Sequence, residues 1–187
     1  KRKDIKYVEY GFLAHGKYRI RDFQTKAGVN TFILGENSFP IRIHLPGKHL
    51  VQDAVAAIAL VEQIYETEKS KTFEESEWNS IVEALATFRG SKRRSEIIGE
   101  YEKILIMDDY GHHPTAIKLT TEGLRAKIGQ DKRLVAVFEP RSNSMKMGAN
   151  HELLAQSFES ADEIFVYANT SVKWDVKSLE KQCKKPL

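Results

Sequence analysis

Residues 5–45 carry the alternating apolar and polar side chains that are typical of β-strands. The alternation is clearest over residues 17–21 and predicts a half-exposed strand there. Apolar residues 31–34 and 40–45 flank the turn-forming residues 35–38, so we expect these two segments to pair as a β-hairpin. The beginning of the chain is therefore predicted to be rich in strands.

Two stretches with helical spacing follow. Apolar residues recur every three or four positions over residues 51–66 and again over residues 73–86, so each stretch is predicted to form one helix. The polar, glycine-containing segment from Thr87 to Arg94 then breaks this period. We therefore place a domain boundary there, with residues 1–88 on one side and residues 89–187 on the other.

The second half of the chain alternates predicted strands with predicted helices. The strands are expected at residues 96–100, 104–107, 134–138 and 164–167, and the helices at residues 115–128 and 151–160. The first two strands are also compatible with a hairpin around residues 101–103. This order is typical of an α/β fold with a mainly parallel sheet and right-handed crossovers. The uninterrupted apolar run 104–106 favours a strand that is covered on both faces. An α+β segment is expected before this sheet.

The loop after the strand at 104–107 holds most of the candidate chemistry. Its residues are Asp108, Asp109, Tyr110, Gly111, His112 and His113, followed by Pro114. Open α/β sheets bind ligands at the carboxyl ends of their strands, and proline suits the first turn of a helix. A second polar loop, residues 139–144, should open at the same sheet edge. We therefore predict one crevice surrounded by Asp108, Asp109, His112, His113 and Arg141.

Composition narrows the function classes. The chain has 187 residues, 41% of them hydrophobic, and a net charge of +3 with basic residues scattered along it, which does not indicate nucleic-acid binding. Cys183 is the only cysteine, so no internal disulfide forms, and a reducing, cytoplasmic location is expected. The longest apolar run, residues 54–61, is too short to cross a membrane, and the start has no secretory signal. The missing initiator methionine predicts a fragment of a longer protein.

Two motifs resemble the Mur ligases, the ATP-dependent enzymes that add amino acids or peptides to UDP-N-acetylmuramate precursors of peptidoglycan. The motifs are Phe-Arg-Gly-Ser-Lys-Arg-Arg-Ser-Glu at residues 88–96 and Asp-Asp-Tyr-Gly-His-His-Pro-Thr at residues 108–115. Segments 139–146, 172–176 and 183–186 are similar to members that attach the tripeptide L-Ala-γ-D-Glu-meso-diaminopimelate. The alternative within the family is a ligase that attaches free L-alanine.

The resemblance implies which parts of a three-domain ligase this chain contains. Residues 1–88 resemble the end of the central ATPase domain, and residues 89–187 resemble most of the carboxyl-terminal Rossmann-like domain. The family's phosphate-binding Gly-Lys-Thr loop is absent from the sequence, so the chain alone is expected to be inactive. ATP and Mg²⁺ are the implied cofactors, with the main Mg²⁺ ligands outside this chain. UDP-N-acetylmuramate and an amino-acid or tripeptide acceptor are the implied partners; the oligomeric state is left unassigned.

The resemblance also implies residue roles. ATP would phosphorylate the muramyl carboxylate, and the acceptor amine would attack the acyl phosphate. Arg94 matches a linker arginine at the nucleotide phosphates, although Lys92, Arg93 and Arg94 are also compatible with a solvated linker. Asp109 matches an aspartate near the ribose and phosphates. The candidate catalytic residues are Tyr110, His112 and His113, which would line the substrate crevice and orient the amine or accept its proton.

Two departures from the family pattern change the expected binding. The family's Gly-x-His-Asn-x-x-Asn motif carries asparagines that read adenine; His49 is kept here, whereas Leu50 and Asp53 replace the asparagines. Since leucine has no amide and aspartate cannot donate, His49 and Asp53 form a weakened nucleotide motif. Where the alanine-adding members carry a pair of arginines, this chain has Ser142 and Met145.

Arg141 is the nearby cation that remains. Arg141 with Ser142 and Asn143 fits a larger, multiply hydrogen-bonding peptide better than free alanine. The alternative for Arg141 is a surface ion pair with Glu139 or Glu152, which would contribute little.

Two functions of other classes stay open. Asp108, Asp109, His112 and His113 are ligand types that would suit the two metal ions of a phosphoesterase, although the second loop supplies few further ligands. We predict no metal site among these residues. The chain could also act as a non-catalytic binding module.

Overall fold

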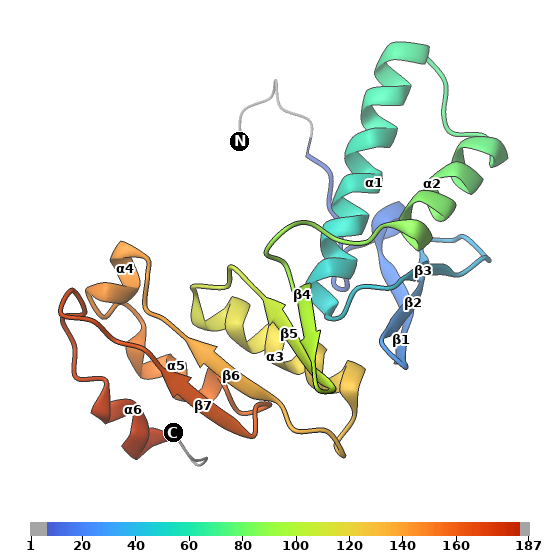
Figure 1. The fold of residues 1–187 in the computed structure, drawn as a ribbon. Helices are drawn as coiled ribbons and strands as arrows, with labels where there is room; N and C mark the ends of the chain where they lie inside the picture. Colours follow the sequence, from blue (N-terminus) through green and yellow to red (C-terminus); the bar gives the residue numbers. More distant parts are fainter. Residues whose placement is uncertain (1–6, 184–187) are drawn as a thin grey trace. The chain divides into compact units, whose positions relative to one another are not determined.

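The computed structural model describes residues 7–183. The chain divides between Arg89 and Gly90 into two compact units (Figure 1). Unit 1 is Lys1–Arg89 and unit 2 is Gly90–Leu187. None of the helices among the described residues is both long enough and apolar enough to cross a membrane.

Unit 1 is a three-stranded antiparallel sheet with two helices. Its elements are η1 (Gly16–Tyr18), β1 (Ile20–Lys26), β2 (Val29–Leu34), β3 (Ile41–Ile43), α1 (Lys48–Lys69) and α2 (Glu75–Thr87). The predicted hairpin is confirmed, because Phe32 pairs with Ile41 and Asn30 with Ile43. The strand predicted at 17–21 is wrong at its start, where η1 forms one 3₁₀ turn before β1 begins.

The core of unit 1 lies between the sheet and α1. Alternate residues of β2 and β3 point inward, as expected for strands with one buried face. The α1 residues Val51, Val55 and Ile58 recur at helical spacing and are almost fully buried against them. This single apolar stripe explains why residues 48–69 form one long helix, and it confirms the helix expected at 51–66.

Glu62 is the charged exception in this stripe. Its side chain is 1% exposed, yet both carboxylate oxygens have donors: Lys17 Nζ at 2.6 Å and the Tyr18 hydroxyl at 2.7 Å. A buried carboxylate is tolerated only when it is paired and hydrogen-bonded. The 3₁₀ turn that carries Lys17 and Tyr18 therefore provides the groups that allow Glu62 to be buried.

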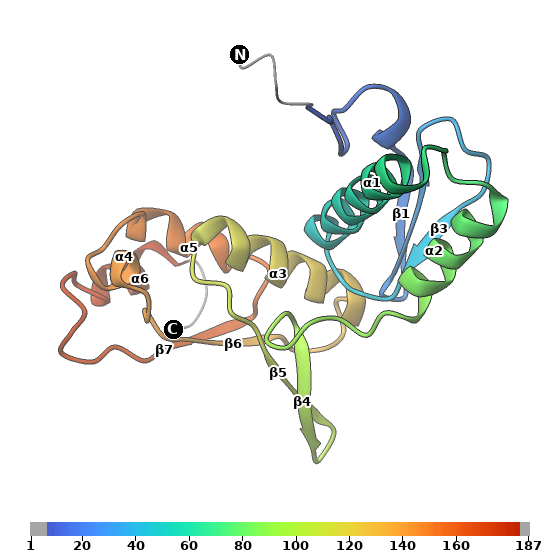
Figure 2. The same cartoon turned by 90° about the horizontal axis from the view of Figure 1, so that it is seen from above.

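Unit 2 contains two small sheets and several helices. Its elements are β4 (Glu96–Tyr101), β5 (Ile104–Asp108), α3 (Pro114–Ile128), β6 (Val135–Phe138), α4 (Asn143–Lys146), η2 (His151–Leu153), α5 (Leu154–Ser157), β7 (Glu163–Val166) and α6 (Lys177–Gln182). β4 pairs with β5 as an antiparallel hairpin, and β6 pairs with β7 in parallel. Figure 2 shows the β4–β5 hairpin projecting away from the β6–β7 pair.

The predicted mainly parallel, Rossmann-like sheet is not found. Only β6 and β7 are parallel, and the other described pairs are antiparallel. Glu102 and Lys103 both have positive φ, as in the two-residue turns that close hairpins, so β5 directs its hydrogen bonds to β4 rather than to β6. The run at 104–106, expected to be covered on both faces, is 43–63% exposed. An apolar run indicates that a strand can be buried, but burial also needs a packing partner.

The core of unit 2 lies between the β6–β7 pair and the helices. Figure 2 shows α3 and α5 on one side of this pair. Phe138, Leu154, Phe158 and Ile164 are at most 8% exposed and form its centre. The helix predicted at 115–128 is confirmed as α3, whereas the one predicted at 151–160 is shorter, with η2 leading into α5.

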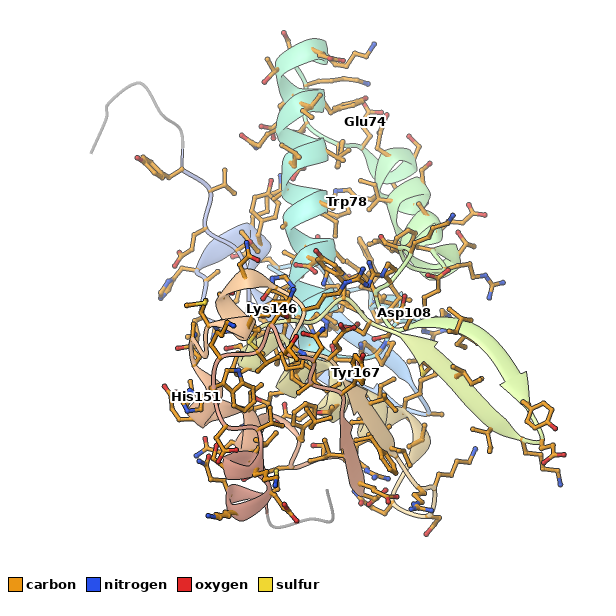
Figure 3. The ribbon with its side chains drawn as sticks, turned by 60° about the vertical axis from the view of Figure 1, so that its left-hand side comes forward. Glu74, Trp78, Asp108, Lys146, His151 and Tyr167 are labelled. Atoms are coloured by element: carbon orange, nitrogen blue, oxygen red, sulfur yellow. The ribbon has the colours of Figure 1, made fainter. Side chains whose placement is uncertain are left out.

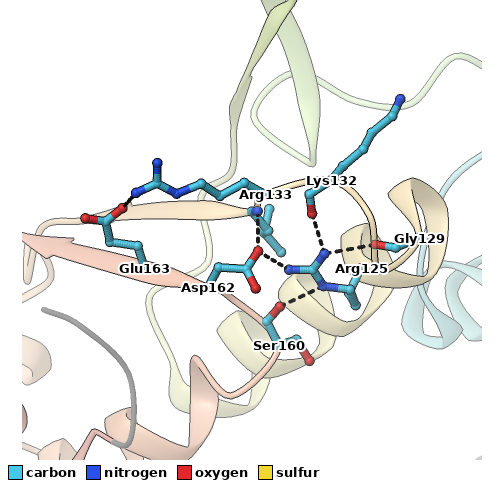
Figure 4. A network of polar contacts seen from close by, with 8 residues as sticks. Arg125, Gly129, Lys132, Arg133, Ser160, Asp162 and Glu163 are labelled. Carbon is cyan, nitrogen blue, oxygen red and sulfur yellow. Dashed lines mark hydrogen bonds and ion pairs between the residues drawn. The ribbon is translucent and has the colours of Figure 1, made fainter.

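A polar network joins the end of α3 to the segments that precede β6 and β7 (Figure 4). The Arg125 guanidinium donates to the carbonyls of Gly129, Lys132 and Ser160 at 2.9, 2.6 and 3.1 Å. It also donates to the Asp162 carboxylate, which accepts in turn from the Leu134 amide at 2.7 Å. One side chain thus fixes the ends of several segments.

Candidate functional site

The first candidate site is built on the turn that leads into β4. Two of its residues, Arg93 and Ser95, have φ values of +57° and +50°. Such left-handed conformations cost roughly 1–2 kcal/mol each for residues other than glycine, so neighbouring contacts must hold them. The Glu96 carboxylate supplies one contact, since it accepts from the Arg93 amide at 2.7 Å. The strained turn places Arg94 between its two left-handed residues.

Asp109 supplies the second contact. Its Oδ2 accepts from the Ser95 amide at 2.9 Å, and its Oδ1 accepts from the Gly111 amide at 2.7 Å. A Cβ atom at Gly111 would lie 2.8 Å from Asp109 Oδ1, so a larger residue would displace this carboxylate from its hydrogen bonds. Asp109 therefore connects the turn before β4 to the loop after β5.

Arg93, Asp108 and Tyr110 form a charged and aromatic group beside this link. Arg93 Nε lies 3.1 Å from Asp108 Oδ2, and its guanidinium lies 4.7 Å from the centroid of the Tyr110 ring. The Arg94 guanidinium lies 5.9 Å from the same ring and makes no ion pair with any described residue. Arg94 is exposed, so its charge is available to a ligand anion.

The two histidines differ in the atoms that they already use. His112 Nδ1 lies 3.1 Å from the Tyr110 carbonyl, which can only accept, so Nδ1 is the donor of this bond and Nε2 of a neutral His112 is a free acceptor. His113 is the N-cap of α3, and its Nδ1 accepts from the Thr115 amide at 3.2 Å. Neutral His113 therefore presents Nε2–H as a donor. Pro114 takes the first position of α3, as predicted.

Reasoning from the sequence missed the parts played by Arg93 and Ser95. Both stand in the Phe88–Glu96 motif, so the signal was present, but positive φ at residues other than glycine cannot be read from the motif. The sequence predicted Arg94 as a phosphate-binding residue. The structure adds that Arg93 forms the ion pair with Asp108, so that Arg94 has no ion pair within the described part of the chain.

The second candidate site is the loop after β6, residues 139–146, which we name the Arg141 loop. Arg141 is exposed and makes no ion pair with any described residue, whereas Glu152 lies 3.4 Å from His151 Nδ1. The expected alternative of a surface ion pair with Glu139 or Glu152 is therefore not found. Ser142 caps α4 by accepting from the Met145 amide at 3.3 Å, and Asn143 is exposed beside it.

The single crevice predicted from a shared parallel sheet is not supported. Within residues 7–183, no hydrogen bond, ion pair or ring contact joins residues 108–113 to the Arg141 loop. The reason is the pairing of β5, which lies in a different sheet from β6. The described contacts therefore do not connect the two groups of candidate residues.

Metal ligation is not favoured by the geometry. Both carboxylates of the first site already have donors, Asp108 from Arg93 and Asp109 from Ser95 and Gly111. Among the described residues, no group of three or more His, Cys, Asp or Glu is placed to hold a metal ion. No observation therefore supports the phosphoesterase alternative.

The remaining candidates lie in unit 1. His49 is half-buried in the first turn of α1, and Asp53 is exposed one turn later. Their spacing places them on neighbouring turns of one helix face. The assignment of unit 1 to the end of a central ATPase domain, with these two residues at a nucleotide, stays a prediction.

Comparison with known proteins gives a consistent family. A family model described as "Mur ligase, glutamate ligase domain" matches residues 93–186, about half of the chain. The chain is 33% identical over 172 residues to the UDP-N-acetylmuramate–L-alanyl-γ-D-glutamyl-meso-2,6-diaminoheptandioate ligase of Escherichia coli, covering 91% of this chain and 35% of that protein. It is 35% identical over 166 residues to the UDP-N-acetylmuramate–L-alanine ligase of Treponema pallidum, covering 89% and 34%.

A solved structure agrees with these relatives. The murein peptide ligase of Psychrobacter arcticus is 34% identical and matches with a TM-score of 0.55, over 87% of this chain and 32% of that one. The chain thus spans about a third of the length of the curated relatives that it matches. The matched region has the mixed α/β fold of their carboxyl-terminal domain. On the evidence of the family model, this chain belongs to the Mur ligase family.

Proposed function

We propose that this chain is the acceptor-side part of an ATP-dependent ligase that joins an L-alanyl peptide to UDP-N-acetylmuramate. The observation that carries the choice of acceptor is Arg141, an exposed cation without an ion pair among the described residues. The relatives alone do not decide, because peptide-adding and alanine-adding ligases match at similar identity. An alanine-adding ligase is therefore the alternative that the experiment must test.

The Arg141 loop suits a peptide that carries a carboxylate. The planar guanidinium of arginine can hold a carboxylate through two parallel hydrogen bonds. Asn143 is exposed next to it and adds an amide that can both donate and accept. Since Ser142 Oγ already caps α4, we assign its contribution mainly to holding Arg141 and Asn143 in place.

The first site suits the reacting groups. ATP supplies the phosphoryl group that activates the muramyl carboxylate, and the acceptor amine then displaces phosphate as the amide bond forms. Arg94, which has no ion pair within the described chain, is the residue that we assign to the phosphate charge. Asp109 is better placed to hold the Arg94 turn, through Ser95 and Gly111, than to contact the nucleotide directly.

We assign the two histidines different roles in the reaction. His112 Nε2 is a free acceptor and can take the proton that the attacking amine releases. His113 Nε2–H is a donor and can orient an oxygen of the acyl group. Tyr110, whose ring lies 5.2 Å from that of His112 and under Arg93, keeps the His112 ring in place.

Mg²⁺ is the cofactor that the family implies beside ATP. The described residues do not fit it: the carboxylates of the first site are occupied by donors, and no group of ligands is placed for a cation. We therefore assign no Mg²⁺ ligand to this chain and no step to the ion.

The test is a competition between acceptors. In a ligase of the relatives' length that carries this chain, the tripeptide L-Ala-γ-D-Glu-meso-diaminopimelate and free L-alanine are offered together, and the products are separated by mass. We expect the tripeptide to be preferred. Arg141→Ala should raise the tripeptide KM by roughly 10- to 150-fold, as expected for a lost charged hydrogen bond worth about 1.5–3 kcal/mol, with little change for ATP.

Arg133→Ala is the matched control. It removes another exposed arginine of unit 2, whose partner is Glu163 at the surface. This variant should leave the tripeptide KM unchanged. A preference for free L-alanine would overturn the peptide assignment and support the alanine-adding alternative.

A further inference from the structure

The Arg141 loop is too short to hold its own shape. The α4 helix within it has only four residues, and helices of this length are not stable without tertiary contacts. Pro140 and Met145 anchor the loop inward, since both side chains are almost fully buried. Arg141, however, points to solvent, so the direction of its side chain depends on how the rest of the loop is fixed.

A distant segment fixes the carboxyl end of this loop. The indole N–H of Trp174 donates to the Met145 carbonyl at 2.7 Å, and the Lys173 amide donates to the Lys146 carbonyl at 2.8 Å. The Met145 carbonyl also accepts from the Gly148 amide at 3.1 Å, so the indole is its second donor, whereas the described donor to the Lys146 carbonyl is the Lys173 amide. The contact spans 29 residues of sequence.

The indole itself packs against two residues. Gly148 has a φ of +84°, and a Cβ atom there would lie 3.2 Å from Trp174 Cδ1. The His151 ring lies 5.4 Å from the indole at an angle of 31°, and His151 Nδ1 is 2.7 Å from the Gly148 carbonyl. Figure 3 shows Lys146 and His151 in the same part of unit 2. Few rotations of Trp174 are compatible with this packing.

We propose that Trp174 is a positioning residue for the acceptor: by holding the Met145 carbonyl, it fixes the loop from which Arg141 binds the peptide carboxylate. The inference rests on the proposed function. It adds a specificity determinant that does not touch substrate and that comes from the segment after β7. Without the indole donor, the Met145 carbonyl keeps only the Gly148 amide, which belongs to the same loop and does not tie it to the segment after β7. The loosened loop would let Arg141 sample orientations in which it misses the carboxylate, and this weakens acceptor binding without changing the reacting groups.

The test uses Trp174→Phe in a ligase of the relatives' length that carries this chain. Phenylalanine keeps a ring near Gly148 and His151 but loses the N–H donor to Met145. We expect the acceptor KM to rise about three- to tenfold, as for one lost hydrogen bond, while kcat and the KM values for ATP and UDP-N-acetylmuramate change less than about twofold. Amide exchange over residues 145–149 should become faster.

Two further variants complete the design. Gly148→Ala adds a methyl group against the indole and strains the backbone, so it should raise the acceptor KM by an independent route. Trp78→Phe makes the same chemical change in unit 1 and should leave the acceptor KM unaltered. Turnover with an unchanged acceptor KM in both Trp174→Phe and Gly148→Ala would overturn the role of Trp174, as would an equal rise in all three KM values. A wild-type enzyme that uses neither acceptor would instead overturn the proposed function.

Discussion

Replacing Arg125 by alanine should destabilise unit 2 through one side chain that holds several chain segments. The Arg125 side chain is 11% exposed and donates to three carbonyls and to the Asp162 carboxylate (Figure 4). The variant removes all four bonds and leaves the carbonyls of Gly129, Lys132 and Ser160 without this donor.

The magnitude follows from the character of each bond. Hydrogen bonds to a charged group contribute roughly 1.5–3 kcal/mol when buried, but water can reach several of the released acceptors. The Asp162 side chain is 42% exposed, so its pairing with Arg125 is screened and adds little beyond the hydrogen bond. We therefore expect Arg125→Ala to lower the free energy of unfolding by about 2–4 kcal/mol.

The assay is equilibrium unfolding of the chain in urea, with hydrogen exchange read on peptides that contain β6 and β7. The matched control is Arg133→Ala, since Arg133 is 68% exposed and pairs with Glu163 at the surface. The control should cost about 0–1 kcal/mol. Equal losses in the two variants, or a loss below about 0.5 kcal/mol for Arg125→Ala, would refute the idea that this network holds the segments together.

Three further predictions concern other parts of the chain. Burial and the hydrogen bond to Glu62 raise the pKa of Tyr18, so the folded state holds this proton to higher pH than the unfolded state does. The contribution of this proton to the free energy of unfolding should be complete below pH about 10 and should be lost as the pH rises further. Alkaline unfolding should therefore show a smaller loss of stability in Tyr18→Phe. Gly111→Ala should cost about 1–3 kcal/mol in urea unfolding, because the new Cβ atom would lie 2.8 Å from Asp109 Oδ1; an unaltered midpoint would contradict this. The chain should bind ATP weakly or not at all, because Leu50 and Asp53 cannot make the hydrogen bonds of the two asparagines that they replace. Each lost hydrogen bond should cost roughly 1 kcal/mol of binding free energy, and micromolar affinity by calorimetry would disprove this.

Local patterns in the sequence predicted local structure well. The spacing of Val51, Val55 and Ile58 predicted α1, and the turn formers at 35–38 predicted the hairpin of β2 and β3. Pro114 predicted the start of α3. In each case the physical cause lies within a few residues, as a helical stripe, a turn or a missing N–H, so the sequence alone contains it.

Long-range partners could not be predicted in this way. The apolar run of β5 is compatible with several neighbours. The hairpin around residues 101–103, one of the two expected arrangements, is confirmed, and it pairs β5 with β4 in place of the expected parallel sheet. Glu62 interrupts a helical stripe, and its burial depends on Lys17 and Tyr18, more than 40 residues earlier in the chain.

The candidate site shows the same division. The cluster at residues 108–113 was visible from its composition. The use of Asp109 to hold Ser95 and Gly111, and of His113 as a helix cap, depends on backbone geometry that no motif states. The nearness of the cluster to the Arg141 loop was inferred from a shared parallel sheet; β5 and β6 lie in different sheets, so that nearness stays a prediction without this support.

The placement of the two tryptophans gives each unit its own optical reporter. Trp78 packs edge-on against Phe73 and Phe39 in unit 1, whereas Trp174 packs near Gly148 and His151 in unit 2. Indole emission shifts to longer wavelength when water reaches the ring, so Trp78→Phe and Trp174→Phe each leave one emitter that follows the melting of a single unit. Coincident emission curves would mean that the two units unfold as one cooperative body, and separate curves would assign a stability to each.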